Sequence, residues 1–240
     1  MAKIKTTKGI LKYKPYPLYT GIAHINKEIE SENLLIVKDI FDRNSIPFIF
    51  VAGTCLGAVR DKDFIDHDDD IDLALSKKDM QKVTDLLWDF IDHGFTVARY
   101  DRRCIISIIR KGQFVDFAFF EEYDDKCYSC DGWLMPKEFI DHTTSIDFMG
   151  NQYLIPEDYE GYLYYSYGPN WSTPVQYFNY NRPKLQILII KIAEKIKAYL
   201  PGFLYFPLKR RAERQVALSY LPKLERYYKY LQTRQKKILS

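Results

Sequence analysis

Four aspartates stand within five residues, at positions 68, 69, 70 and 72, in the segment GTCLGAVRDKDFIDHDDDIDL that runs from Gly53 to Leu73. Two like charges 4 Å apart repel each other by about 1 kcal/mol in bulk water and by more near a protein surface. The crowding therefore predicts a positive partner for these carboxylates, either a metal ion or a structural arginine.

Side-chain alternation predicts which carboxylates meet. If the residues from 70 onward form a strand, Asp70 and Asp72 share one face while the apolar residues between and after them enter the core. In QFVDFAFF the same alternation places Asp116 opposite its apolar neighbours. If the two strands are adjacent, three carboxylates surround one site, and such oxygen-rich sites suit Mg²⁺ or Mn²⁺. For Asp68 and Asp69, ordinary loop solvation or a helix cap is the alternative.

A turn that could hold phosphate precedes the acidic run. Gly53 and Thr54 lie where a strand is expected to pass into a helix, so their backbone N–H groups and the Thr54 hydroxyl could bind an anion. Gly57 would permit close approach of the backbone to a ligand, and Arg60 could reach the same anion through two hydrogen bonds. His67 is a candidate acid or base, although a histidine in a loop is more often only solvated.

The elements that must position these residues alternate along the chain. Apolar spacing predicts a helix over 24–41, a buried strand in IPFIFVA, a short helix over 56–60, a strand over 70–75 and a helix over 77–93 that Ser76 caps and Gly94 ends. Three further apolar runs, FTVARY, CIISIIR and QFVDFAFF, read as strands. This order indicates a mixed α/β or α+β sheet with helices packed against it.

Charge is distributed unevenly along the 240 residues. From Lys191 to the end there are 13 Lys and Arg against 3 acidic residues, whereas the first 190 residues hold 22 basic and 29 acidic ones. KLQILIIKIAEKIKAYL has apolar residues at helical spacing, and FLYFPLKRR follows it. This pattern fits the surface of an anionic membrane, but a helix packed on the domain would look similar, and solvent or nucleic acid are the other candidates for the basic tail. The start of the chain lacks the apolar core of a secretory signal, which favours a cytosolic, reducing location.

Four cysteines do not make a disulfide framework in a chain of this size. Cys127 and Cys130 form a single CxxC motif, with Cys104 and His142 as possible further zinc ligands. One such pair without a clear second pair is weak evidence for zinc. The run YEGYLYYSYGPNW is more typical of a helix that packs tyrosines against a core than of a ligand platform.

A Gly-Thr turn followed by Asp70-Ile71-Asp72-Leu73, with a third acid on a later strand, resembles the signature of the nucleotidyltransferase superfamily. GTCLGAVRDKDFIDHDDDIDLAL is more closely similar to the hallmark of the LicD family, which includes bacterial phosphocholine transferases and resembles ribitol-phosphate transferases. The resemblance continues at VDFAFF and at DFMGNQYLIPEDYEGYLYYSYGPNW, and it covers about residues 48–171. The chain departs from the family at His67, where an aromatic residue is usual, and at Asp61-Lys62-Asp63, where a histidine and a glycine are common.

The resemblance implies an α+β fold with a nucleotidyltransferase-like mixed sheet flanked by helices. We expect an N-terminal extension at 1–23, a catalytic domain at 24–182 and a basic amphipathic helical tail at 183–240, and the extension and the tail lie outside the resemblance. It implies transfer of a phospho-alcohol from a CDP-activated donor to a hydroxyl of a glycan, with release of CMP. Asp70, Asp72 and Asp116 would be the catalytic residues and the ligands of Mg²⁺ or Mn²⁺; Asp116 would either complete the metal site or take the proton of the acceptor. Substrate would be bound by Gly53, Thr54, Gly57, Arg60, His67 and Asp69.

Two other functions fit parts of the same pattern. One is a nucleotidyltransferase that adds a nucleoside monophosphate to RNA, a small molecule or a protein; the LicD-like stretch argues against it and makes a nucleic-acid partner unexpected. The other is a non-catalytic scaffold on a membrane, which gives no reason to keep three mutually repelling acids together.

Overall fold

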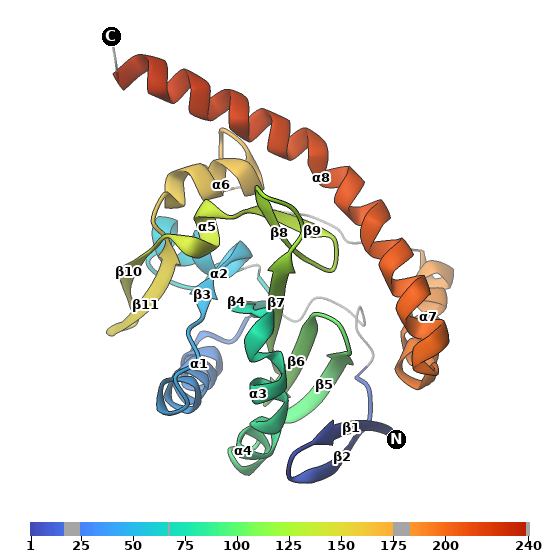
Figure 1. Cartoon of the computed structure of the whole chain (residues 1–240). Coiled ribbons are helices and arrows are strands. Elements are labelled where there is room, and N and C mark those ends of the chain that lie inside the picture. The colour runs from blue at the N-terminus through green and yellow to red at the C-terminus, as the bar shows by residue number, and fades with distance from the viewer. Residues whose placement is uncertain (17–24, 67, 175–182, 239–240) are drawn as a thin grey trace.

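The chain forms a mixed β-sheet with helices around it (Figure 1); the computed structural model describes residues 1–16, 25–66, 68–174 and 183–238. The main path of the sheet runs β10-β11-β3-β4-β7-β6-β5. These strands are β3 (Ile49–Phe50), β4 (Asp70–Ser76), β5 (Thr96–Asp101), β6 (Ile105–Arg110), β7 (Gln113–Glu122), β10 (Thr143–Phe148) and β11 (Asn151–Pro156). Beyond this path, β8 (Cys127–Cys130) pairs with the end of β7 and with β9 (Trp133–Pro136). The α+β class expected from the sequence is confirmed.

The centre of the sheet is the parallel pair β4 and β7, in which Asp72 lies directly opposite Asp116. One face of this pair carries the core, where the Phe117 ring lies 5.1 Å from Phe41 and 5.5 Å from Phe90, measured between ring centroids. Those two phenylalanines belong to α1 (Lys27–Arg43) and α4 (Leu87–Asp92), which follows α3 (Met80–Asp85). Because side chains alternate along a strand, the aspartates of β4 and β7 point to the face opposite α1 and α4.

The remaining elements surround that second face and the edges of the sheet. After β3 come α2 (Ala52–Leu56) and a π-helical turn (Gly57–Asp61), and a 3₁₀ turn (Lys77–Asp79) precedes α3. Further along are α5 (Glu138–Asp141), α6 (Tyr159–Tyr167), α7 (Lys184–Tyr199) and α8 (Gly202–Ile238). Figure 1 shows α8 as a long curved helix across one side of the molecule, and it contains Pro207 and Pro222. Proline inside a helix removes a backbone hydrogen bond and bends the axis.

The N-terminal residues form a hairpin that the sequence did not predict. β1 (Ala2–Thr6) and β2 (Gly9–Tyr13) pair with each other and not with the main sheet. Trp88 of α4 donates its indole N–H to the Thr6 hydroxyl at 3.0 Å, and Lys8 pairs with Asp89 at 2.9 Å. The hairpin is therefore attached to α4. The expected boundary at 23/24 and the last residue of the expected catalytic domain, 182, fall outside the described residues, so these limits stay predictions.

Several predicted elements have different bounds. The buried strand expected in IPFIFVA is reduced to Ile49–Phe50, because Ala52 already adopts a left-handed φ of 46° and begins α2. The helix expected over 77–93 divides into α3 and α4, and the start of the helix expected at His24 lies outside the described residues; α1 begins after Asn26, whose side chain accepts from the Ile29 N–H. The expected helix over 56–60 falls across α2 and the π-helical turn. The strands expected around 70–75 and in the three apolar runs are confirmed.

Candidate active site

Three carboxylates meet on the face of the sheet that α1 and α4 leave open. Each of Asp70, Asp72 and Asp116 offers an oxygen, and the three oxygens lie within 4.8 Å of one another. The strand register explains the meeting: positions 70 and 72 of β4 share a face, and β7 brings Asp116 directly beside Asp72. The expected convergence of these three side chains is present in the structure.

The electrostatics of the cluster favour a bound cation. Burial, followed by the charge of Asp72, holds the pKa of Asp70 well above its usual value. Burial, followed by the charge of Asp116, does the same to the pKa of Asp72. A divalent cation would relieve both effects, because its charge stabilises the ionised carboxylates that burial and repulsion destabilise. The donor set, three carboxylates converging on one point, fits the oxygen ligands that Mg²⁺ and Mn²⁺ prefer.

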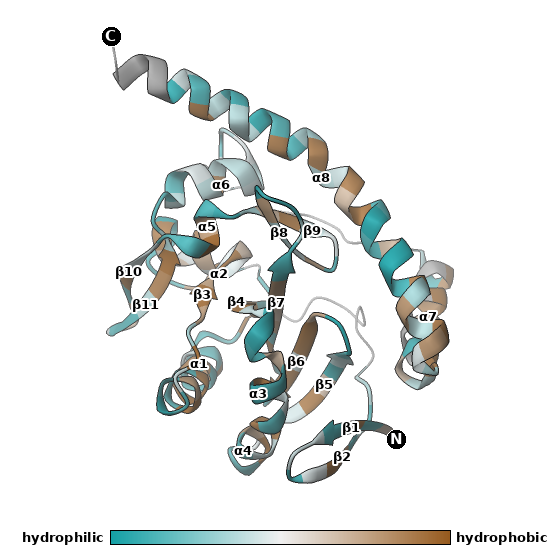
Figure 2. Ribbon diagram, viewed as in Figure 1, coloured by the Kyte–Doolittle hydropathy of each residue, from teal (hydrophilic) through white to brown (hydrophobic). Residues whose placement is uncertain are grey.

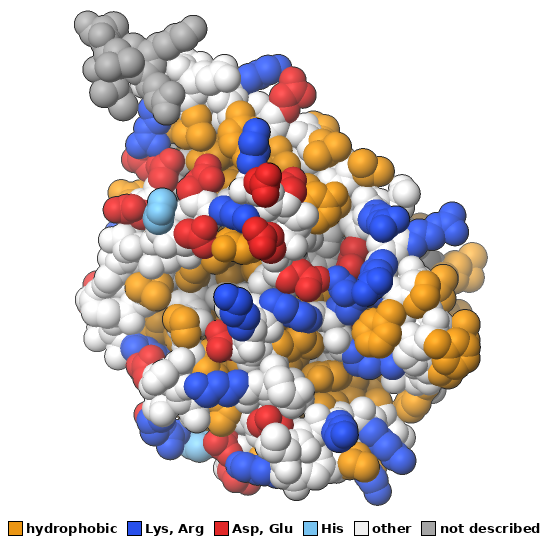
Figure 3. Space-filling view, in the orientation of Figure 1, with side chains coloured by type: hydrophobic (Ala, Val, Ile, Leu, Met, Phe, Trp, Pro, Cys, Tyr) orange, Lys and Arg blue, Asp and Glu red, His pale blue; other side chains and the backbone are white. Residues whose placement is uncertain are grey.

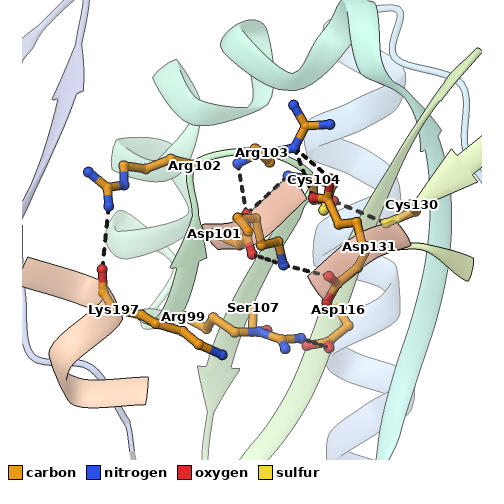
Figure 4. A network of polar contacts seen from close by, with 12 residues as sticks. Arg99, Asp101, Arg102, Arg103, Cys104, Ser107, Asp116, Cys130, Asp131 and Lys197 are labelled. Carbon is orange, nitrogen blue, oxygen red and sulfur yellow. Dashed lines mark hydrogen bonds and ion pairs between the residues drawn. The ribbon is translucent and has the colours of Figure 1, made fainter. Parts of the chain in front are cut away.

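A positive partner for the cluster is supplied by Arg99, a residue that sequence reasoning did not identify. Its guanidinium donates from Nη2 to Asp116 Oδ2 at 2.6 Å and from Nε to Ser107 Oγ at 3.0 Å (Figure 4). Ser107 is fully buried on β6, opposite Asp116, so the arginine crosses from β5 over β6 to reach β7. The initial alternatives of metal or structural arginine therefore do not exclude each other: Arg99 binds one of the carboxylates, while Asp70 and Asp72 show no ion pair among the described residues.

Thr54 and Gly53 fix the acidic strand from the side of α2. The Thr54 hydroxyl accepts from the Asp72 backbone N–H at 2.9 Å, and Thr54 is only 3% exposed. A Cβ added at Gly53 would lie 1.8 Å from Asp68 Oδ2, so the absence of a side chain at Gly53 is what admits the Asp68 carboxylate. These two residues position the carboxylates in this structure; their expected contact with a donor phosphate stays a prediction.

Gly57 and Arg60 have partners within the chain itself. A Cβ at Gly57 would stand 2.5 Å from the backbone oxygen of Asp63, which shows that the close approach is made by the following loop and not by a ligand alone. The Arg60 guanidinium binds Asp61 through Nε at 2.8 Å and Nη2 at 2.7 Å. Arg60 thus has a partner within the chain, and its expected contact with a phosphate stays a prediction.

The loop before β4 carries the remaining candidates. Asp69 is exposed as a whole residue, but partial burial of its carboxyl group raises its pKa, and the charge of Asp116 adds to the effect. Burial and the neighbouring charge of Asp69 raise the pKa of Asp68 to about 6. Asp68, Asp69 and Asp70 also offer oxygens within 4.8 Å of one another. His67 lies outside the described residues, so its role as acid, base or solvated side chain stays open.

Tyr162 supports the turn into α2, and sequence reasoning gave it no such role. The Ala52 backbone N–H donates to the Tyr162 hydroxyl at 2.6 Å, and Tyr162 is fully buried. Ala52 has a positive φ of 46°, which is uncommon for a residue with a Cβ. Tyr162 therefore anchors a strained residue next to the site. Tyr165 is fully buried as well, which confirms that tyrosines of this aromatic run pack against the core.

The cysteines do not assemble the zinc site that was considered. All four are free and buried, and no metal-capable group among the described residues contains Cys127, Cys130 or His142. Cys104 does lie within reach of Asp131 and Glu213. There, however, Glu213 binds Arg103 at 2.8 Å and Asp131 binds Lys209 at 2.6 Å, so protein cations already balance these acids. Figure 4 labels Cys104, Asp131 and Arg103 of this cluster.

A cavity of about 370 Å³ adjoins the carboxylates through Arg99, which lines it. Its walls come from the end of the N-terminal hairpin, from β5 and from the α7–α8 region. Tyr13, Tyr100 and Tyr205 are among the lining residues, and so are Asp101 and Lys209, which pair at 2.5 Å. A ligand in this cavity would contact aromatic rings and the other side of the arginine that holds Asp116.

Comparison with solved structures gives likenesses of low sequence identity and low TM-score. The lincosamide antibiotic adenylyltransferase LnuA, in its lincomycin-bound crystal structure, is 11% identical; the match covers 72% of this chain and 98% of that one, with a TM-score of 0.43. ANT(2″)-Ia in complex with adenylyl-2″-tobramycin is 13% identical, over 78% and 98% of the two chains, with a TM-score of 0.43. A putative nucleotidyltransferase from Thermotoga maritima is 13% identical, over 73% and 95%, with a TM-score of 0.35.

The family comparison is independent of these likenesses. A search of curated proteins gives no match. The model of the LicD/FKTN/FKRP nucleotidyltransferase domain matches residues 45–158, a segment that begins just before β3 and includes the Gly-Thr turn, β4 and β7. The three converging carboxylates all lie inside it. Residues 45–158 thus match the nucleotidyltransferase domain of the LicD/FKTN/FKRP family, and this match supports a transferase.

Proposed function

We propose that this transferase moves a phospho-alcohol, phosphocholine or a polyol phosphate, from a CDP-activated donor to a hydroxyl of a cell-surface glycan. The observation that carries the proposal is the convergence of Asp70, Asp72 and Asp116 inside a LicD-family domain. The acceptor oxygen forms a new bond to the phosphorus that carries the alcohol. The bond between this phosphorus and the bridging oxygen of the diphosphate breaks, and CMP leaves with that oxygen.

Asp70, Asp72 and Asp116 would hold Mg²⁺ or Mn²⁺. The ion would supply neutralisation of the charge on the donor diphosphate, which is where phosphoryl transfer gains most of its catalysis. The protein contributes by fixing the three carboxylates before substrate binds: β-sheet register places two of them, Thr54 holds the Asp72 backbone and Arg99 holds the Asp116 side chain. Such preorganisation lowers the cost of arranging charge in the transition state.

Asp116 has two possible tasks, as third metal ligand or as the base that takes the acceptor proton. Arg99 holds Oδ2, so Oδ1 would perform either task. The two tasks predict different results for Asp116→Asn. Weaker Mn²⁺ binding, measured by calorimetry, would assign it to the metal; unchanged Mn²⁺ binding with loss of activity would assign it to proton transfer.

The acceptor would enter through the cavity that Arg99 shares with the carboxylates. Tyrosine rings offer apolar surface with a polar hydroxyl, which suits the face of a sugar. Tyr13, Tyr100 and Tyr205 line this cavity together with Arg99, and this supports an approach of the acceptor from the β5 edge of the sheet.

The decisive experiment measures CMP release from CDP-choline, CDP-ribitol and CDP-glycerol with Mg²⁺, with ATP and CTP tested in parallel for pyrophosphate release. We expect metal-dependent CMP release from one CDP-alcohol, lost in Asp72→Asn and retained in Asp125→Asn, which changes an exposed acid outside the site. Pyrophosphate from a triphosphate without CMP would favour the nucleotidyltransferase alternative. Binding of neither metal nor donor by the wild type would favour the scaffold. A cytosolic location stays a prediction.

A further inference from the structure

An extended apolar surface covers α7 and the first turns of α8. Of the twenty large hydrophobic side chains that are exposed among the described residues, ten lie between 185 and 208. They are Leu185, Leu188, Ile189, Ile192, Ile196, Tyr199, Phe203, Leu204, Phe206 and Leu208. Figure 2 shows brown residues along α7 and the adjacent part of α8, and Figure 3 shows orange side chains gathered there on the outside of the molecule. We call this surface of α7 and the start of α8 the hairpin face; it is separate from the N-terminal β1–β2 hairpin.

Folding alone does not explain the hairpin face. Single exposed apolar residues are ordinary, but contiguous apolar patches on soluble proteins are small unless they bind something. The spacing of the exposed residues in α7 repeats by three and four, so they form one stripe along the helix. Their exposed fractions reach 68% at Leu185 and 76% at Phe203 in α8. The stripe therefore points away from the body of the protein.

The charges around the hairpin face have one dominant sign. Between 184 and 214 the sequence holds eight Lys and Arg and only two acids, Glu194 and Glu213. Glu213 is bound to Arg103 at 2.8 Å. The exposed basic side chains that border the face include Lys184, Lys197, Arg210, Arg211 and Arg214. The surroundings of the face are thus complementary to an anionic partner.

We propose that the hairpin face binds the surface of an anionic lipid bilayer. In this arrangement α7 and the start of α8 lie in the plane of the interface, with the apolar stripe at the acyl boundary and the bordering Lys and Arg among the headgroups. The combination of a strong apolar stripe and a basic border matches such interfacial helices, which gain both from burial and from attraction to anionic lipids. Among the described residues, no helix is both long and apolar enough to cross a membrane.

The proposal gives the cavity beside Arg99 a defined orientation. Lys197 and Leu200, at the end of α7, line that cavity together with Tyr205 of α8. A bilayer against the hairpin face would therefore lie close to the mouth through which an acceptor enters. This point rests on the proposed function, whereas membrane binding itself does not.

Binding is measured with the full chain by flotation on vesicles of phosphatidylcholine, with and without 30% phosphatidylglycerol. We expect binding to the anionic vesicles that weakens when NaCl is raised from 0.1 to 0.5 M, because salt screens the attraction of exposed charges. Ile192→Glu and Leu188→Glu should each lower the partition coefficient at least about tenfold, since each removes one buried aliphatic side chain. Leu35→Glu, at an equally exposed leucine of α1, is the matched control and should bind like the wild type.

The variants are checked by circular dichroism and by Asp72-dependent CMP release, so that a folding defect is recognised. Absence of wild-type binding to anionic vesicles overturns the proposal. Vesicle binding that is unchanged in both Ile192→Glu and Leu188→Glu also overturns it. A concentration-dependent dimer that Ile192→Glu abolishes, in a chain that ignores vesicles, would assign the face to a second copy instead. Because the assay needs no donor or acceptor, its failure is separate from failure of the proposed reaction.

Discussion

Replacing Asp72 by Asn tests two effects of the carboxylates at once: their repulsion lowers the stability of the fold, and their binding of metal supports catalysis. With oxygens no more than 4.8 Å apart and an effective dielectric constant of 20, each ionised pair among Asp70, Asp72 and Asp116 repels by at least about 3 kcal/mol. Replacing Asp72 removes its repulsion with Asp116, whose charge Arg99 partly offsets, and its repulsion with Asp70. Without metal, Asp72→Asn should therefore be more stable than the wild type by about 3 kcal/mol.

The assay is thermal unfolding at neutral pH in EDTA and again with saturating Mn²⁺. For a chain of this length, 3 kcal/mol corresponds to a rise in Tm of roughly 6–12 °C. Ligand at about 100 times its Kd adds about 2.7 kcal/mol to the wild type, and we expect this gain to be lost in the variant. CMP release should fall by about 100-fold or more. Asp125→Asn should leave all three quantities unchanged.

The reasoning is refuted by either of two results. One is an Asp72→Asn variant that is less stable than the wild type in EDTA, which would mean that the carboxylate contributes favourable hydrogen bonds that outweigh repulsion. The other is a Tm of the variant that still rises with Mn²⁺ as far as that of the wild type, which would place the metal elsewhere.

Three further outcomes are expected. Burial raises the pKa of Glu30 to about 8 from an ordinary 4.5, so ionisation of this carboxyl costs stability. In urea unfolding between pH 5 and pH 8, Glu30 should lower the free energy of unfolding by up to about 1.4 kcal/mol per pH unit. Glu30→Gln should remove this contribution, while Asp68, Asp70 and Asp72, whose pKa values are also raised, keep theirs. Thr54→Val leaves the Asp72 N–H without its hydroxyl acceptor, which should cost about 1–3 kcal/mol and lower CMP release, whereas Thr54→Ser should restore both. In Gly53→Ala the new methyl group displaces the Asp68 carboxylate, so CMP release should drop while the circular dichroism spectrum stays the same.

Sequence alone predicted the part of the site that depends on strand alternation. Residues two positions apart on a strand share one face, and this rule predicted that the side chains of Asp70 and Asp72 lie together without any knowledge of the fold. The location of Asp116 needed one assumption, that its strand neighbours β4, and the parallel pairing bears it out. Local patterns of this kind are visible in a single sequence because they involve only short separations along the chain.

Residues that act across the sheet could not be predicted in this way. Arg99 reaches Asp116 from two strands away, and nothing in FTVARY distinguishes its arginine from an ordinary surface residue. The contact of Gly57 with the loop that follows it was not predicted either, and its expected contact with a ligand stays a prediction. The N-terminal hairpin was also missed, since its apolar residues are few and its partner, α4, lies about eighty residues later.

The ion pairs of α8 have a consequence for what counts as one folding unit. Lys209 joins Asp101 of β5 to Asp131 after β8, Glu213 binds Arg103, and Arg234 binds Asp158 at 2.7 Å. Tyr227 of the same helix is almost completely buried in the core. The family module ends at residue 158, yet its edges are closed by a helix from the last forty residues. The segment that matches the family and the segment that folds as one unit therefore have different limits in this chain. The matched residues 45–158 complete their core only together with α8.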